Sequence, residues 1–263
     1  MREWLFGRQA VHESLRAGRR QPVRVLVLEG AVRAPIIDDI AAAAQQCRIP
    51  IEKCSRQLLD RILGHEEHQG VALETSTYPY ADIHAMLDLA RTRQEPPLLL
   101  LLDLIQDIHN LGSLLRTAEA VGVHGVVIQE RRAAGITPAT VNTSSGAVEH
   151  LLVAQVTNLV KEIERLKTAD LWIAGLEDAP GARSYTETNM ILPLAIVVGS
   201  EGAGLRRLVR ERCDWLMSIP MRGKITSLNA AVAGSIALYE ALRQRSQFAA
   251  TTPSPFAPGS GAV

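Results

Sequence analysis

Three short stretches of this 263-residue chain combine backbone-exposing or helix-starting positions with polar side chains that can hold a ligand. The candidate functional residues among them are Asn110 and Arg116 in the first stretch, Glu201 in the second, and Ser227 and Asn229 in the third. Backbone N–H groups at a helix start, together with a hydroxyl and an amide, suit a polar or anionic ligand. We interpret the three stretches as candidate ligand-binding loops.

Each stretch also has a purely structural interpretation. Asn110 and Ser227 each precede an apolar, helix-like segment and are residue types that cap helices. Gly199 to Leu205 carries three glycines around Glu201 and could be a tight turn. Its spacing is not G-x-G-x-x-G, and no Gly-Lys-Ser/Thr follows, so neither the dinucleotide-binding pattern nor a P-loop fits. The sequence leaves cap and ligand loop open as alternatives.

Metal chemistry is not indicated. His65 and His68 enclose two glutamates, but this spacing is one residue shorter than the zinc-protease motif. The three cysteines are odd in number and show no close pairing, so neither a disulfide framework nor a cysteine zinc site is predicted. We expect no metal.

Charge and hydropathy restrict the class of protein. Lys plus Arg equals Asp plus Glu at 28 each, so only local clusters of cations can indicate an anionic partner. Such clusters occur at Arg16, Arg19, Arg20 and Arg24, and at Arg206, Arg207, Arg210 and Arg212. No apolar run is long enough to cross a bilayer, and charged residues interrupt the N-terminus where a signal peptide would need an apolar core. We expect a cytoplasmic protein without a membrane partner.

Hydrophobic patterning predicts two units that position these loops. Residues 1–76 read as a compact α/β unit, residues 77–97 as a linker with a helix at 83–90, and residues 98–246 as a second unit. Residues 247–263, rich in Thr, Pro, Ser and Gly, are predicted to be a disordered tail. In the first unit we expect strands at 23–28, 49–53 and 70–75, and helices near 11–15, 36–46 and 58–63.

The second unit alternates short apolar runs with helix-like segments. The runs are continuous rather than alternating, which is typical of parallel strands covered on both faces. This α/β rhythm predicts a doubly wound parallel sheet, in which ligands bind at the carboxyl ends of the strands. We expect strands at 98–102, 125–128, 151–156, 171–174, 194–198 and 215–219, and helices at 111–121, 158–167, 205–212, 230–242 and, beginning at Pro138, one short helix more.

Taken together, the three stretches resemble the signature motifs of the SpoU family of RNA 2′-O-methyltransferases, within the SPOUT superfamily. The first motif is matched by Asn110, Gly112 and Arg116, the second by 199–205, and the third by 219–221 with 227–229. The layout is most similar to the TrmH/RlmB group, nearest to its RlmB branch, which acts on guanosine of 23S ribosomal RNA. Two departures stand out: Ile108 replaces a usual proline, and Asn229 is followed by two alanines.

The resemblance implies a parallel-sheet catalytic domain tied in a trefoil knot and working as a homodimer, preceded by a small α/β domain that binds the RNA substrate. It implies S-adenosylmethionine as the methyl donor. Backbone groups near Gly199, Ile219, Met221 and Leu228 are implied to hold this cofactor, with Thr143 and Gly146 contributing. Periodicity alone could not have indicated a knot, which general topology disfavours.

The chemistry implied by the resemblance needs help from the protein, because a ribose hydroxyl is a weak nucleophile. An arginine does not lose its proton in a protein. We therefore expect Arg116 to bind the phosphate beside the target ribose, and Glu201 to orient Arg116 or to accept the hydroxyl proton. Asn110 and Asn229 would position the ribose and loops, with Ser227 in support.

We expect the first unit to take part in recognising the RNA substrate. Arg16, Arg19, Arg20 and Arg24 are predicted to grip folded RNA, with the linker letting the unit move; a solvated helix face is the alternative interpretation. Three other functions stay open: methylation of transfer RNA, a resistance methylase acting on ribosomal RNA, and a non-catalytic RNA-binding or ribosome-assembly factor.

Overall fold

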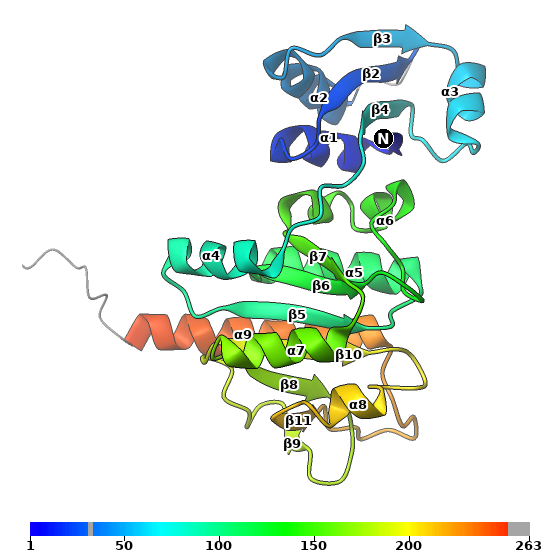
Figure 1. Cartoon of the computed structure of the whole chain (residues 1–263). Helices are drawn as coiled ribbons and strands as arrows, with labels where there is room; N and C mark the ends of the chain where they lie inside the picture. The colour runs from blue at the N-terminus through cyan, green and yellow to red at the C-terminus, as the bar shows by residue number, and fades with distance from the viewer. Residues whose placement is uncertain (31–33, 252–263) are drawn as a thin grey trace, which may run out of the picture.

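The computed structural model describes residues 1–30 and 34–251. It contains two sheets, stacked one above the other along the long direction of the molecule (Figure 1). No helix within these residues combines the length and apolarity needed to cross a bilayer. The final helix, α9 (Ala230–Thr251), continues beyond the end predicted at residue 242. It includes 247–251, the start of the predicted disordered tail, because Gln247, Ala249 and Ala250 favour helix. The rest of the predicted disordered tail, 252–263, lies outside the described residues.

The first sheet has four strands in the order β1-β4-β2-β3, and only the β2–β3 pair is parallel. Helices α1 and α2 cover one face with the main core, and α3 covers the other. Strand β1 was not predicted, because Leu5 is its one fully buried residue and the pattern is too short to register. The elements are β1 (Arg2–Phe6), α1 (Arg8–Ala17), β2 (Pro22–Leu28), α2 (Pro35–Gln46), β3 (Ile51–Cys54), α3 (Arg56–Leu63) and β4 (Val71–Ser76).

The second sheet has seven strands in the order β7-β6-β5-β10-β8-β11-β9, and all its pairings are parallel. The prediction of a doubly wound parallel sheet is confirmed. Strand β9 and the 3-10 turn η1 were not predicted, because they are too short to show a period. The strands are β5 (Leu98–Asp103), β6 (Gly125–Gln129), β7 (Val153–Val156), β8 (Trp172–Leu176), β9 (Arg183–Ser184), β10 (Leu194–Gly199) and β11 (Trp215–Ser218).

Helices cover both faces of this sheet. Side chains of α5 and α9 pack with one face, and those of α4, α7 and α8 with the other. Helix α4 packs on β6, where a side chain at Gly125 would overlap Met86. The segment predicted as a linker thus contributes a helix to the second sheet's core. The remaining elements are α4 (Ile83–Arg93), α5 (Ile108–Val121), α6 (Pro138–Thr143), η1 (Ala147–His150), α7 (Leu159–Thr168) and α8 (Arg207–Arg210), the last shorter than predicted.

The strand order explains how three loops reach one place. Strand β10 lies between β5 and β8, although both of its neighbours precede it in the chain. Because parallel strands share one carboxyl edge, the chain leaving β5, β10 and β11 emerges on the same side of the sheet (Figure 1).

The two sheets are joined by a buried ion pair. The guanidinium of Arg20 donates to both carboxylate oxygens of Glu149 at 2.8–3.0 Å, and also to Glu3 and to the Ser76 carbonyl. The side chains of Arg20 and Glu149 are 1% and 0% exposed. One hydrophobic cluster also runs through both units without a break. We therefore expect the first unit to be held in place rather than to swing on a linker.

This junction corrects part of the RNA-binding prediction. Arg20 is buried and fully partnered, so it cannot contact RNA in this arrangement. Arg19 donates to the carbonyls of Leu151 and Pro79 and to the Tyr78 hydroxyl, so it too acts as a junction residue. The sequence could not reveal this, because Glu149 lies more than a hundred residues away.

Replacing Arg20 alone should destabilise the protein strongly. Arg20→Met leaves the Glu149 carboxylate buried without a counter-charge, and breaking such a pair costs about 3–5 kcal/mol. Urea unfolding measures the loss. The double variant Arg20→Met/Glu149→Leu should recover most of it, since it removes both charges. A double variant no more stable than the single one would contradict this account of the junction.

Candidate active site

A cavity of about 580 Å³ opens at the carboxyl edge of the second sheet. Its walls come from the ends of β8, β10 and β11, the loops that follow them, and the first turn of α9. The lining includes four residues predicted from the third motif and its strand, Ile219, Met221, Ser227 and Leu228, together with Gly199, Glu201 and Asn229. The second and third motifs therefore meet around one space, as the parallel sheet predicts.

The loop after β10 depends on Gly199. A Cβ atom at this position would overlap the backbone of Gly204, because the loop folds back on itself through a bridge between Ser200 and Gly204. Gly202 and Gly204 have φ values of 74° and 64°, which glycine adopts without strain. The loop is thus a tight turn, and the same residues line the cavity.

Asn229 joins all three motifs. Its Oδ1 accepts hydrogen bonds from the backbone N–H groups of Ala231 (2.9 Å) and Val232 (3.2 Å), which makes it the N-cap of α9. Its Nδ2 donates to Asn110 Oδ1 at 2.8 Å and to Glu201 Oε1. One side chain therefore starts the last helix and holds the first and second loops together.

The cap interpretations need two corrections. Ser227 does not cap α9; the helix begins at Ala230, and Asn229 takes the cap position. Asn110 does not cap α5 either, because Asp107 accepts from the Asn110 N–H at 2.8 Å. Asn110 lies in the first turn of the helix, with its amide turned to Asn229. Ile108, which replaces the usual proline, is the first helical residue, a position where proline is tolerated.

Arg116 lies on the exposed side of α5, two turns from its start. Its guanidinium donates to Ser145 Oγ at 3.3 Å. Within residues 1–30 and 34–251, it forms no ion pair with Glu201, whose carboxylate instead accepts from Asn229. The prediction that Glu201 orients Arg116 is therefore not seen in this structure.

Thr143 and Gly146, which were predicted to contribute to cofactor binding, do not line the cavity. Thr143 donates to the carbonyl of Ile108, and its side chain fills the space that Gly112 leaves on α5. Gly146 lies beneath α1, where a Cβ atom would overlap Glu13. Thr143 therefore packs within the second unit, and Gly146 packs at the junction between the two units.

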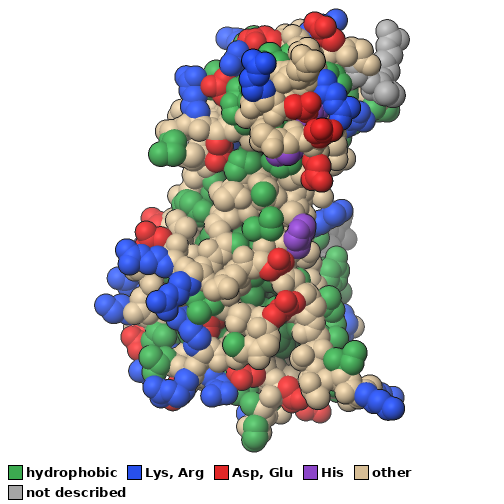
Figure 2. Space-filling model, turned by 90° about the vertical axis from the view of Figure 1, so that its right-hand side faces the viewer, with side chains coloured by type: hydrophobic (Ala, Val, Ile, Leu, Met, Phe, Trp, Pro, Cys, Tyr) green, Lys and Arg blue, Asp and Glu red, His purple; other side chains and the backbone are tan. Residues whose placement is uncertain are grey.

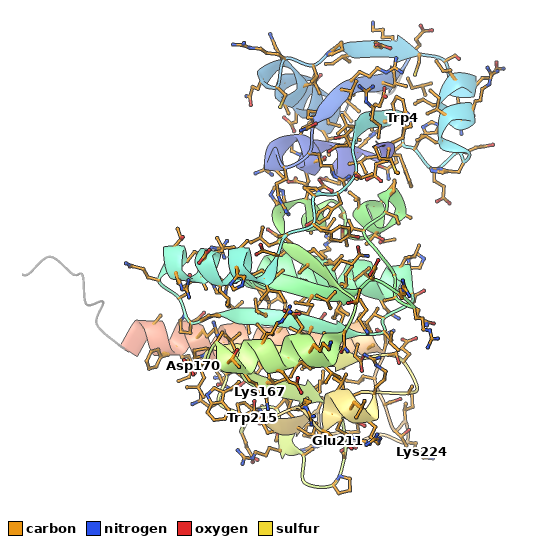
Figure 3. All side chains as sticks on the ribbon, in the orientation of Figure 1. Trp4, Lys167, Asp170, Glu211, Trp215 and Lys224 are labelled. Carbon is orange, nitrogen blue, oxygen red and sulfur yellow. The ribbon has the colours of Figure 1, made fainter. Side chains whose placement is uncertain are left out.

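The cavity lining is acidic. Glu177, Asp178 and Glu201 belong to it, and no Lys or Arg of the described chain does. One oxygen of Glu177 accepts from Arg210 at 3.1 Å, while the other is buried and has no protein partner. Arg222 and Lys224, in the loop after β11, are exposed and do not line the cavity, and Figure 3 shows where Lys224 lies. The cavity suits a ligand with positive charge or hydrogen-bond donors, whereas the helix start and its polar side chains had suggested a polar or anionic ligand.

Glu177 was missed from the sequence. It directly follows the apolar run of β8, so it stands at the carboxyl end of a strand. That position was the available signal, because ligands bind at such ends in parallel sheets.

Comparison with known proteins relates both units to one group. Residues 97–239 match the SpoU rRNA Methylase family, and residues 4–81 match the family described as RNA 2′-O ribose methyltransferase substrate binding. YacO of Bacillus subtilis, assigned to the TrmH family of tRNA/rRNA methyltransferases, is 40% identical over 243 residues, covering 92% of this chain and 96% of that protein.

Solved structures show the same fold. The SpoU methyltransferase AviRb of Streptomyces viridochromogenes, crystallised with the cofactor AdoMet, has a TM-score of 0.77 at 23% identity, covering 94% of this chain and 91% of that one. A structure described as an RNA 2′-O ribose methyltransferase has a TM-score of 0.73 at 26% identity, covering 93% and 89%.

Separate substitutions of Asn229 and Ser227 show which of the two residues caps α9. Asn229→Ala removes the cap of α9 and the link between the loops, so the free energy of unfolding should fall by about 0.5–2 kcal/mol. Ser227→Ala should change it by less than about 0.5 kcal/mol, as for an ordinary surface position. Equal losses in chemical denaturation would restore Ser227 as the cap.

Gly199 should tolerate no side chain. In Gly199→Ala the added methyl group overlaps the Gly204 backbone, and overpacking of this kind costs about 1–3 kcal/mol. Gly223→Ala is the matched control, since no atom lies within 4 Å of its added methyl group and its φ is not positive. Thermal unfolding should separate the two variants; a wild-type midpoint for Gly199→Ala would show that the loop can open at no cost.

Proposed function

Because the chain belongs to the SpoU rRNA methylase family, we propose that it transfers a methyl group from S-adenosylmethionine to a ribose 2′-hydroxyl of RNA. The observation that carries this proposal is the Asn229 amide, which brings Asn110 and Glu201 together at the edge of the acidic cavity. The proposed site is formed by Asn110, Arg116, Glu201, Ser227 and Asn229.

The cavity fits the proposed cofactor. S-adenosylmethionine bears a sulfonium and an ammonium group, and supplies an activated methyl group when it is bound. Glu177, Asp178 and Glu201 give the space a complementary negative charge, and the unpartnered Glu177 oxygen can accept a hydrogen bond. Gly199, Ile219, Met221 and Leu228 would offer backbone and apolar contacts.

Arg116 and Glu201 would divide the work of activating the hydroxyl. Arg116 is exposed and bonded only to a serine hydroxyl, so its guanidinium can turn to a phosphate beside the ribose and stabilise negative charge on the oxygen. A carboxylate can take the proton that an arginine cannot. Glu201, held by Asn229, is the proposed acceptor, and the Asn110 amide is placed to position the ribose.

The first unit is the proposed RNA-binding domain, with its boundary near residue 76 and the methyltransferase domain beginning near residue 98. Its match to a substrate-binding family supports this division. We further propose a guanosine of 23S ribosomal RNA as the target, supported by the family's relation to ribosomal RNA and by the likeness to the RlmB branch. Methylation mapping of ribosomal and transfer RNA with and without this protein tests the assignment.

The exposed side of α9 supports a homodimer. Val232 and Tyr239 are seven residues apart, on one side of the helix, and are 48% and 54% exposed. We propose that this side of α9 packs against a second copy of the chain. Membership of the family implies this homodimer, and it also implies that the catalytic domain forms a trefoil knot.

Arg116→Ala should strongly slow methyl transfer without changing the affinity for the cofactor. The rate should fall about 100-fold or more, because a preorganised donor to the developing charge is lost. Calorimetry should give the wild-type affinity for S-adenosylmethionine, since Arg116 does not line the cavity. Arg91→Ala, another exposed helical arginine, is the control and should transfer normally. Wild-type turnover by Arg116→Ala would contradict the assigned role, and a wild-type protein that binds no cofactor would contradict the proposed function.

A further inference from the structure

Most arginines of the two predicted clusters are already paired with carboxylates. On α8 and beside it, Arg206 pairs with Asp103, Arg207 with Glu211, Arg210 with Glu177 and Arg212 with Glu164. In the first unit, Arg16 pairs with Glu13, and Arg24 pairs with both Glu52 and Glu74. An arginine that is neutralised by a carboxylate has less to offer a phosphate. Neither predicted cluster therefore supplies a free cationic surface.

Four cations at the carboxyl edge of the second sheet differ from these. Arg131 and Arg132 follow β6, and Arg222 and Lys224 follow β11. All four are exposed, and their side chains have no partner within the described chain. Figure 2 views the molecule from the side onto which the strands run out, and Lys and Arg side chains gather along its lower part, over the second sheet. Figure 3 shows Lys224 at the margin of the same side.

The loop that carries Arg131 and Arg132 is fixed against the first motif. Gln106 Nε2 donates to the Arg132 carbonyl at 3.1 Å, and the Ala134 N–H donates to the Ile105 carbonyl at 2.8 Å. Arg132 and Leu104 both have positive φ, near 59°, a conformation that costs free energy for residues other than glycine. The backbone thus holds the two arginines in a set position beside the loop that leads to Asn110. Glu130, the acid of this loop, has its N–H bonded to Val156 of β7, on the far side.

The strand order places the two pairs on opposite sides of the candidate site. Between β6 and β11 lie β5, β10 and β8, so the two strands are four interstrand steps apart. At about 4.8 Å a step, they are separated by roughly 19 Å. A single strand of RNA a few nucleotides long covers this distance. The candidate site, at the ends of β5 and β10, lies between them.

We propose that Arg131 and Arg132 on one side, and Arg222 and Lys224 on the other, hold the phosphates of the substrate RNA strand on either side of the target ribose. The inference rests on the proposed function, and assigns the phosphate grip to the methyltransferase domain in place of the Arg16–Arg24 cluster. Free cations contribute to affinity without reading sequence. The acidic cavity then takes the cofactor while the surrounding cations take the RNA backbone.

The salt dependence of RNA binding tests this assignment on the full chain. The probe is a ribosomal RNA transcript, with affinity measured across a range of salt concentrations. Each contact to a single strand contributes about 0.7 to the slope of log affinity against log salt, so Arg131→Gln/Arg132→Gln should lower the slope by about 1.4. Arg222→Gln/Lys224→Gln should do the same, and the four-fold variant should lose about twice as much, since the two pairs are far apart.

Arg91→Gln/Arg165→Gln is the matched control. It removes the same charge from exposed helical arginines that are each paired with a neighbouring acid, and should leave the slope unchanged. Cofactor affinity should be wild type in every variant. An unchanged slope in both double variants of the proposed phosphate-binding cations, or an equal fall of the slope in the control, would overturn the inference. Absence of methyl transfer by the wild-type protein would overturn the proposed function instead, and the binding slopes would still decide the inference.

Discussion

The side chain of Asn229 accepts two backbone hydrogen bonds from the first turn of α9 and donates two more, to Asn110 and Glu201. These groups come from three loops that are distant in the sequence and adjacent only because β10 lies between β5 and β8. Helix stability and site geometry therefore depend on the same amide. No residue with only a hydroxyl could satisfy both sides, because two donors and an acceptor are needed at once.

The sequence predicted the second sheet well, because buried parallel strands leave continuous apolar runs such as β5. It also placed the second and third motifs correctly at one edge. The predictions from sequence failed where a residue's hydrogen-bond or ion-pair partner is distant in the chain, or where two neighbouring residues could both make the same hydrogen bond. Asp107 and Asn110 are both good caps, and only the structure shows which of the two reaches the free N–H. Thr143 ends the short helix α6 and packs on Gly112 of α5, while Gly146 packs on α1, so neither residue lines the cavity. The buried pair of Arg20 with Glu149 has no local signature at all.

Positive and negative side chains occupy different parts of this protein, although its net charge is zero. Carboxylates line the cavity, the arginines on and beside α8 are paired with carboxylates, and unpaired cations stand at the ends of β6 and β11. A neutral sum is therefore no argument against a nucleic-acid partner. What matters is which cations lack a carboxylate of their own, since these keep their electrostatic field in solution.

The joint between the two units has a consequence for the shape of the substrate. Arg20 and Glu149 are buried between the sheets, and one apolar core runs through both. The spacing between the first sheet and the candidate site is consequently fixed by the fold. Under the proposed function, an RNA that contacts both units has to present its target ribose at that distance from the part that the first unit contacts. Folded RNAs differ in this distance even where their local sequences agree, which allows selection by three-dimensional shape.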